Sequence, residues 1–406
     1  ISLIAMSSTT LQAQIPASLP DVWVSDVTTT KNHIPTTLLD DVVVNCDMIT
    51  DVNSDLPIKA IVWDEGVLSR VSHLYFEDGA GNRASFQNDE HTFTGHRPDI
   101  VLGNDVFSPS PSANPTYRAV VIYIDSADYI RVNFYNLTNA GTPAFNAKLT
   151  SSSQLSQYTQ INFFNPQYHD TDPMPHIDMW SEATANIIGT NGKAYHALYE
   201  WVATWSEINF QTGLSNIFYT SGHINGTNYT PIPLQHTKTA ALFKDSSDMP
   251  DVACGTNFVT GEKYASFVYR TFNPTTALQV ADYNFTKDTV TKYWNYRANT
   301  ALFPRIEAMN LFDPSNEARW DVVSILGIAP FSNYSAYNMN FATDTNIIPL
   351  ATIPLLQNVD IKSPCVAGGH LYLTSAPEIG NKQFTAGFYP WVTQDLYVRE
   401  IVANNG

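Results

Sequence analysis

The chain repeats a short frame in which a proline is followed by one variable residue and then a β-branched residue. The variable position holds Asp99, His176, Asp251 and Arg305 in four of the copies, and Asp178 and Glu307 stand two residues further on. Paired carboxylates carry acid and base catalysis at glycosidic bonds, and a cation can hold an anionic sugar. Brought into one pocket, these residues would suit a glycoside hydrolase or a polysaccharide lyase. The carboxylates are then the catalytic candidates, and His176 and Arg305 are the binding candidates.

The same acidic residues also fit a structural role. An aspartate that follows a proline at the start of a strand often accepts hydrogen bonds from neighbouring backbone amides. Repetition favours this role for Asp99 and Asp251, because catalysis needs different residues in different repeats. The better functional candidates are the residues that break the repeat, namely His176, Asp178, Arg305 and Glu307.

Other residue types extend the set of candidates. Trp205 and Trp391 stand at expected strand ends, where an indole ring can stack on a sugar. A cluster just before Pro173 supplies the weak metal candidates His169, Asp170 and Asp172. These side chains would suit a divalent cation, although Asp-Thr-Asp-Pro is also an ordinary turn. We expect no other cofactor.

The frame opens the first strand of a repeated unit. An apolar middle strand follows, and then a strand of alternating apolar and polar residues, as in 117–124 and 129–135. Because proline cannot donate to a β-ladder, we expect it to be the first residue of its strand. The units run approximately over 41–97, 98–174, 175–249, 250–303, 304–363 and 364–406.

Repeats of this length predict one closed all-β domain over residues 15–406. We predict a six-bladed β-propeller, with seven blades as the alternative. The last unit has room for only three strands, and residues 20–27 alternate as a strand does. We therefore expect an N-terminal strand to complete the last blade, which would remove the exposed sheet edges where the ring closes.

Composition limits the partners. The chain has 406 residues and a formal net charge of −17, with only 21 lysines and arginines. Nucleic-acid backbones and anionic membrane surfaces attract clustered basic residues, so both are disfavoured as partners. Charged residues make up 15% of the chain and aromatic residues 12%, a balance that favours strands and long polar loops.

Residues 1–14 resemble the second half of a secretory signal peptide. Their apolar run is too short to span a bilayer, and Leu11-Gln12-Ala13-Gln14 resembles the cleavage region common in proteins exported by Bacteroidota. No other stretch approaches the length of a membrane span. We expect an exported protein, located in the periplasm, outside the cell or on its surface.

Three stretches carry a resemblance to a known family. Pro98-Asp99-Ile100-Val101, the apolar run 120–125 and Ile130-Arg131-Val132 resemble the repeats of secreted bacterial sialidase-like β-propellers. The resemblance covers nearly the whole chain and implies the propeller fold. The Ser-x-Asp-x-Gly-x-x-Trp box of sialidase propellers is absent, so the resemblance implies no catalytic residues.

These observations leave three functional hypotheses. The leading one is a non-catalytic binding or assembly module that contacts a glycan or a protein of the cell envelope, because the chain carries no catalytic signature and has long polar loops. The second is a polysaccharide-active enzyme, a hydrolase or lyase, with its site in the central funnel of the propeller. The third is a structural subunit of a secretion or surface apparatus.

Overall fold

The computed structural model describes a chain built of strands and turns. It covers residues 22–23, 44–54, 56–64, 70–87, 91–104, 117–156, 175–188, 194–209, 214–224, 247–256, 260–271, 277–296, 301–309, 320–327, 334–340, 348–352, 362–368, 381–389 and 395–403. From residue 301 onward the description covers the backbone alone. The described residues contain no α-helix, and none of them forms a helix long and apolar enough to cross a membrane.

The strands form antiparallel sheets that follow chain order. The largest sheet holds β2 (Val44–Thr50), β3 (Pro57–Asp64), β4 (Val71–Glu77), β6 (Thr92–Asn104), β7 (Tyr117–Asp125), β8 (Ile130–Thr138) and β9 (Asn146–Gln154), with β5 (Ser85–Phe86) parallel to β9 at its edge. A second sheet holds β10 (His176–Ile188), β11 (Ala194–Asn209) and β12 (Leu214–His223). A third holds β13 (Ser247–Thr256), β14 (Lys263–Thr271), β15 (Ala277–Asn284) and β16 (Thr289–Tyr296).

Two further sheets complete the described chain. One holds β17 (Ala301–Met309), β18 (Trp320–Gly327), β19 (Tyr334–Asn340) and β20 (Ile348–Thr352). The other holds β21 (Lys362–Gly368), β22 (Asn381–Tyr389) and β23 (Asp395–Ala403), and β1 (Val22–Trp23) pairs with β23 at its edge. In that pairing Val22 lies opposite Val398 and Trp23 lies opposite Tyr397. Residues 1–14 lie outside the described residues.

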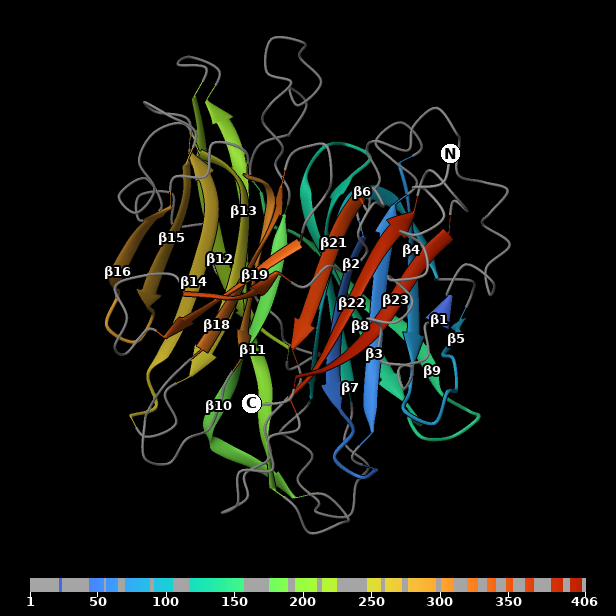
Figure 1. Ribbon diagram of the computed structural model, residues 1–406. Coiled ribbons are helices and arrows are strands. Elements are labelled where there is room, and N and C mark those ends of the chain that lie inside the picture. Colours follow the sequence, from blue (N-terminus) through green and yellow to red (C-terminus); the bar gives the residue numbers. More distant parts are fainter. Residues whose placement is uncertain are drawn as a thin grey trace, which may run out of the picture.

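The first strands of the successive units lie side by side in a closed circuit. β2 contacts β6, β6 contacts β10, β10 contacts β13, β13 contacts β17 and β17 contacts β21, which in turn contacts β2. The remaining strands of each unit extend outward from this circuit (Figure 1). Antiparallel sheets arranged around a shared centre define a β-propeller. The predicted all-β propeller class is therefore confirmed.

The repeated prolines lie inside β-bulges, not at strand starts. The strand register shifts between His96 and Asp99 in β6, and between Asp248 and Asp251 in β13. The same shift recurs in β17 and β21, whereas Pro175 directly precedes β10. A bulge frees residues from the ladder, so it accepts a proline that has no N–H to donate. The prediction that the proline is the first residue of its strand was therefore wrong for β6, β13, β17 and β21.

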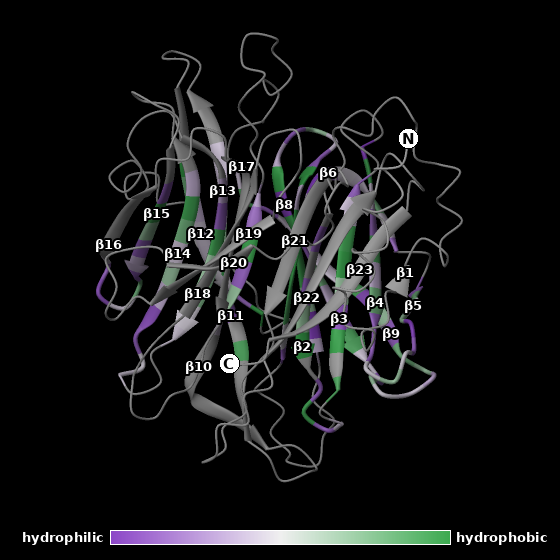
Figure 2. Cartoon of the chain, in the orientation of Figure 1, coloured by the Kyte–Doolittle hydropathy of each residue, from purple (hydrophilic) through white to green (hydrophobic). Residues whose placement is uncertain are grey.

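The core forms where the sheets pack face to face. Every residue of β7 is buried, as its apolar run predicts. One hydrophobic cluster joins β2 through β9 to the sheet of β10, and another joins that sheet to β13 through β15. Figure 2 shows apolar segments along the described strands of these sheets. Trp201 and Trp205 are the largest side chains that are fully buried there.

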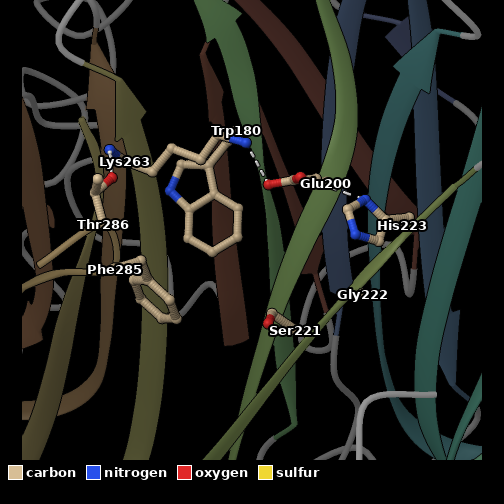
Figure 3. Close-up of a pocket in the computed structure, with 8 residues that line it drawn as sticks. All are labelled: Trp180, Glu200, Ser221, Gly222, His223, Lys263, Phe285 and Thr286. Carbon is tan, nitrogen blue, oxygen red and sulfur yellow. Dashed lines mark hydrogen bonds and ion pairs between the residues drawn. The ribbon is translucent and has the colours of Figure 1, made fainter. Parts of the chain in front are cut away.

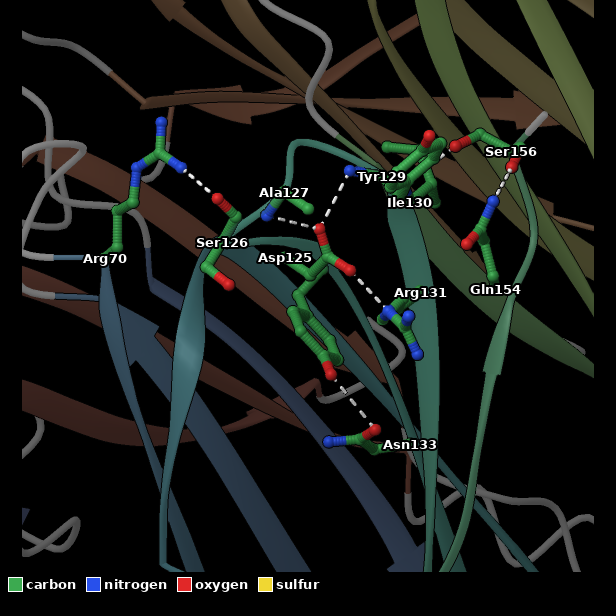
Figure 4. Close-up of polar contacts among 11 residues, drawn as sticks. Arg70, Asp125, Ser126, Ala127, Tyr129, Ile130, Arg131, Asn133, Gln154 and Ser156 are labelled. Carbon is green, nitrogen blue, oxygen red and sulfur yellow. Dashed lines mark hydrogen bonds and ion pairs between the residues drawn. The ribbon is translucent and has the colours of Figure 1, made fainter. Parts of the chain in front are cut away.

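The turn between β7 and β8 shows how aspartate side chains organise the loops (Figure 4). Oδ1 of Asp125 accepts hydrogen bonds from the amides of Ala127 at 2.8 Å and Tyr129 at 2.9 Å, and Oδ2 accepts one from Arg131. Arg70, which directly precedes β4 in the neighbouring unit, donates to the carbonyl oxygen of Ser126. The turn is thus fixed by its own first residue and braced from outside.

Gly103 marks a close approach between β6 and the next sheet. A Cβ atom here would lie 2.5 Å from Sδ of Met179 and 2.7 Å from the carbonyl oxygen of Leu198. We expect Gly103→Ala to lower the free energy of unfolding by about 1–3 kcal/mol, because a backbone atom cannot move aside cheaply. Chemical denaturation measures the change. Lys148→Ala, at an exposed position on β9, is the control and should change stability by less than about 0.5 kcal/mol.

Candidate functional site

Three candidate residues predicted from the sequence meet at the centre of the propeller. Asp99 comes from β6, His176 from β10 and Asp251 from β13, and one ligand atom of each lies within 4.8 Å of the others. Nδ1 of His176 is 2.9 Å from Oδ2 of Asp99 and 3.5 Å from Oδ1 of Asp251. All three residues are buried. We call this group the central cluster.

The carboxylates of the central cluster are also bonded to backbone amides. Oδ1 of Asp99 accepts from the amide of Ile100, and its Oδ2 accepts from the amide of Ile177 on the next inner strand, both at 2.9 Å. Oδ1 of Asp251 accepts from the amide of Val252 at 2.8 Å. The bond from Ile100 is the structural role that the sequence indicated for Asp99, whereas the bond from Ile177, which fastens one inner strand to the next, was not predicted.

Asp178 and Asp47 make the same kind of link. Asp178 accepts from its neighbour Met179 at 2.7 Å and from the amide of Cys254 on β13. Asp47 accepts from its neighbour Met48 at 2.6 Å and from the amide of Leu102 on β6. Each carboxylate thus spans the gap between two inner strands.

Sequence analysis missed Asp47. The first unit has no proline to fix the frame, so the alignment slipped. Asp47 and Asp178 each accept a hydrogen bond from an amide of the next inner strand, so they occupy equivalent positions in their repeats. Asn45, two residues before Asp47, is then the equivalent of His176. The Asn45 side chain donates to the carbonyl oxygen of Pro98 at 2.7 Å.

Burial and mutual repulsion change the acidity of these carboxyl groups. Loss of solvent raises the pKa of Asp178 to about 7, and the charges of Asp251 and Asp99 add to the effect, while the amides of Cys254 and Met179 oppose it. Desolvation also raises the pKa of Asp47 well above its usual range, with Asp178 and Asp99 contributing.

The other predicted site residues lie elsewhere. Arg305 and Glu307 stand on β17, whose backbone neighbours β13, and their side chains are outside the described part of the structure. Trp205 is fully buried, with its ring stacked 6.4 Å from that of Phe218, so it packs in the core and offers no surface to a sugar. Trp391 and the metal candidates His169, Asp170 and Asp172 lie outside the described residues.

A second site, which the sequence did not indicate, opens between the sheet of β10 to β12 and the sheet of β13 to β16 (Figure 3). Trp180, Glu200, His223, Lys263 and Phe285 line it. We call it the Trp180 pocket. These residues come from different strands of two repeats and share no spacing, so only the packing of the sheets brings them together.

Comparison with known proteins supports the fold. No protein-family model and no curated protein sequence matches this chain. Among solved structures it resembles the α-L-arabinofuranosidase of Fusarium graminearum bound to an iminosugar inhibitor, with a TM-score of 0.50 and 9% identity over 91% of this chain and 95% of that one. The arabinobiose complex of the Fusarium graminearum GH93 α-L-arabinofuranosidase gives a TM-score of 0.50 and 8% identity, covering 95% of this chain and 97% of that one. At these identities the likeness establishes the fold alone.

The raised pKa of Asp178 predicts a pH-dependent stability. Its carboxyl group takes up a proton at about pH 7 in the folded protein, against an ordinary value of 3.8. The folded state binds more protons than the unfolded chain between these values, so the free energy of unfolding should fall as pH rises through this window. Across this window Asp178→Asn should remove a decrease in the free energy of unfolding on the order of 2 kcal/mol.

Denaturation curves at several pH values from 4 to 8 measure this slope. Glu77→Gln, on β4 and outside the central cluster, is the control. Its free energy of unfolding should depend on pH as that of the native protein does. A stability that rises across the same window in the native protein would contradict the assignment.

Proposed function

We propose that this chain is a carbohydrate-active β-propeller of the glycoside hydrolase class, with its reacting groups at the central cluster. The observation that carries the proposal is the convergence of Asp99, His176 and Asp251 from three inner strands, with Asp178 two residues after His176 on β10. Burial raises the pKa of Asp178 to about 7, so its carboxyl group can give up a proton near neutral pH. A carboxylic acid with a raised pKa beside a second carboxyl group is the arrangement that cleaves a glycosidic bond. The fold likeness to arabinofuranosidases supports the same substrate class.

The geometry assigns roles within this proposal. Asp178 would be the general acid that protonates the leaving oxygen, and Asp99 or Asp251 would be the carboxylate on the other side of the bond. Oxygens of Asp99 and Asp251 lie within 4.8 Å of each other. His176, only 2% exposed, would hold the carboxylates in place without touching substrate.

A second candidate function is binding without catalysis, to a glycan or a protein of the cell envelope. The backbone hydrogen bonds of Asp99, Asp178 and Asp251 favour it, because a carboxylate that fastens two strands has fewer lone pairs for a substrate. Only 10% of the Asp99 side chain and 9% of the Asp251 side chain remain exposed. The two candidates predict opposite results in one assay.

The assay measures release of reducing sugar from a panel that includes arabinan, other plant and microbial polysaccharides and aryl glycosides. The hydrolase proposal expects turnover whose kcat/KM falls as pH rises above about 7, where Asp178 loses its proton. Asp178→Asn should lower turnover by about 100-fold or more, with the melting temperature recorded to exclude unfolding. Glu262→Gln, away from the cluster, should leave it unchanged. Binding of a glycan with no turnover on any substrate would favour the second candidate.

We also propose that the propeller has six blades and that β1 closes it. The circuit of β2, β6, β10, β13, β17 and β21 supports the number, and the pairing of β1 with β23 supports the closure. Closure by a strand from the opposite end of the chain protects an edge that would otherwise stay open.

Deletion of residues 15–30 should lower the melting temperature by several degrees, because it removes β1 and reopens the edge of β23. Deletion of residues 1–14 alone keeps β1 and is the matched control. Equal melting temperatures for both truncated chains and the full chain would show that β1 does not close the ring.

A further inference from the structure

The Trp180 pocket is small and lies between two sheets. Its volume is about 230 Å³. Pockets that hold whole drug-sized ligands usually measure about 300–1,000 Å³, so this one suits a single ring or a comparably small group. None of the residues of the central cluster lines it, although Trp180 lies on β10 with His176 and Asp178. The other lining residues include Glu200 on β11, Lys263 on β14 and Phe285, which directly follows β15.

One side of the pocket is a fixed aromatic surface. The rings of Trp180 and Phe285 meet edge to face at 4.7 Å, and Tyr219 packs edge to face against Phe285 at 5.6 Å. The indole N–H of Trp180 donates to the carbonyl oxygen of Tyr264 at 2.6 Å. Trp180 is almost fully buried, so the partly exposed ring of Phe285 is the surface that a ligand would meet. Rings held in this way lose little entropy when an apolar ligand face stacks on them.

The other side of the pocket is polar and internally paired. Glu200 forms an ion pair with Lys263, and its other oxygen lies 3.4 Å from Nδ1 of His223 (Figure 3). The hydroxyl of Ser221 lines the same space. Glu200 and Lys263 are each 21% exposed and His223 is 49% exposed, so a ligand can reach all three.

The balance of charge selects among ligands. The carboxylate of Glu200 repels an anion, and the ammonium group of Lys263 repels a cation. A neutral ligand with several hydroxyl groups meets donors and acceptors on the polar side and an aromatic ring on the other. Pyranose sugars have this form, because their hydroxyls project from the rim of the ring and their C–H groups form an apolar face.

We infer that the Trp180 pocket binds one neutral pyranose unit of a glycan, at a site separate from the central cluster. The inference goes beyond the proposed hydrolysis and holds whether or not the central cluster is catalytic. In a hydrolase the pocket would anchor a polysaccharide at a distance from the reacting groups, and in a binding protein it would be a recognition site.

The test titrates the full chain with sugars and measures binding by isothermal calorimetry. The neutral probes are the methyl pyranosides of glucose, galactose and mannose, and the anionic probe is glucuronate. We expect saturable binding of at least one neutral pyranoside, and glucuronate should bind at least about tenfold more weakly than methyl glucoside or not at all. Glu200→Gln should reduce the affinity for the neutral sugar and also reduce the discrimination against glucuronate. A purely structural ion pair would not change that discrimination.

Further variants separate the pocket from the rest of the protein. Phe285→Leu should weaken binding about tenfold through loss of the stacking ring, and His223→Ala, at a half-exposed position, provides a second test if Phe285→Leu does not fold. Glu262→Gln removes a carboxylate that pairs with Lys287 outside the pocket and should bind as the native protein does. Asp178→Asn should also bind normally, even if it abolishes hydrolysis.

Three results would overturn the inference. They are the absence of saturable binding by any neutral pyranoside, binding that neither Glu200→Gln nor Phe285→Leu weakens, and preferential binding of glucuronate by the native protein.

Discussion

The hydrogen bonds from inner-strand carboxylates to the backbone of the next inner strand are the interaction on which the described centre of this propeller depends. Sheets in a propeller share no β-ladder across the centre, so side chains must supply the polar contacts between them. Asp47, Asp99 and Asp178 each supply one, to Leu102, Ile177 and Cys254. Each bond satisfies an amide that would otherwise be buried without a partner.

This device has an electrostatic cost. Because the inner strands converge, their carboxylates approach one another in a region with little solvent, and the pKa values of Asp47 and Asp178 rise. The imidazole of His176 lies between Asp99 and Asp251, with its Nδ1 close to an oxygen of each carboxyl group. The centre thereby contains one carboxyl group, that of Asp178, whose pKa is raised to about 7, in the range that acid and base catalysis requires.

The sequence could predict what repeats and could not predict what packing creates. The proline frame located Asp99, His176 and Asp251 and brought them to one place correctly, because repeated strands occupy equivalent positions. It misplaced the prolines, since periodicity does not reveal a bulge. It missed Asp47, which has no proline beside it, and it could not find Glu200 and Lys263, which become neighbours only when two sheets pack. Trp205 was assigned to a binding surface although it packs in the core, because the sequence alone does not distinguish a core aromatic residue from one that binds a sugar.

β6 belongs to two sets of partners. Its first residues pair with β4 through Val71 and Thr94, and from Gly95 onward the same strand pairs with β7. Neighbouring units elsewhere in the described chain are separate sheets, whereas here an unbroken strand leaves one and enters the other. A local opening of the first unit would therefore pull on the ladder of the second. The described strands from β2 to β9 should accordingly exchange their amide hydrogens as one cooperative unit.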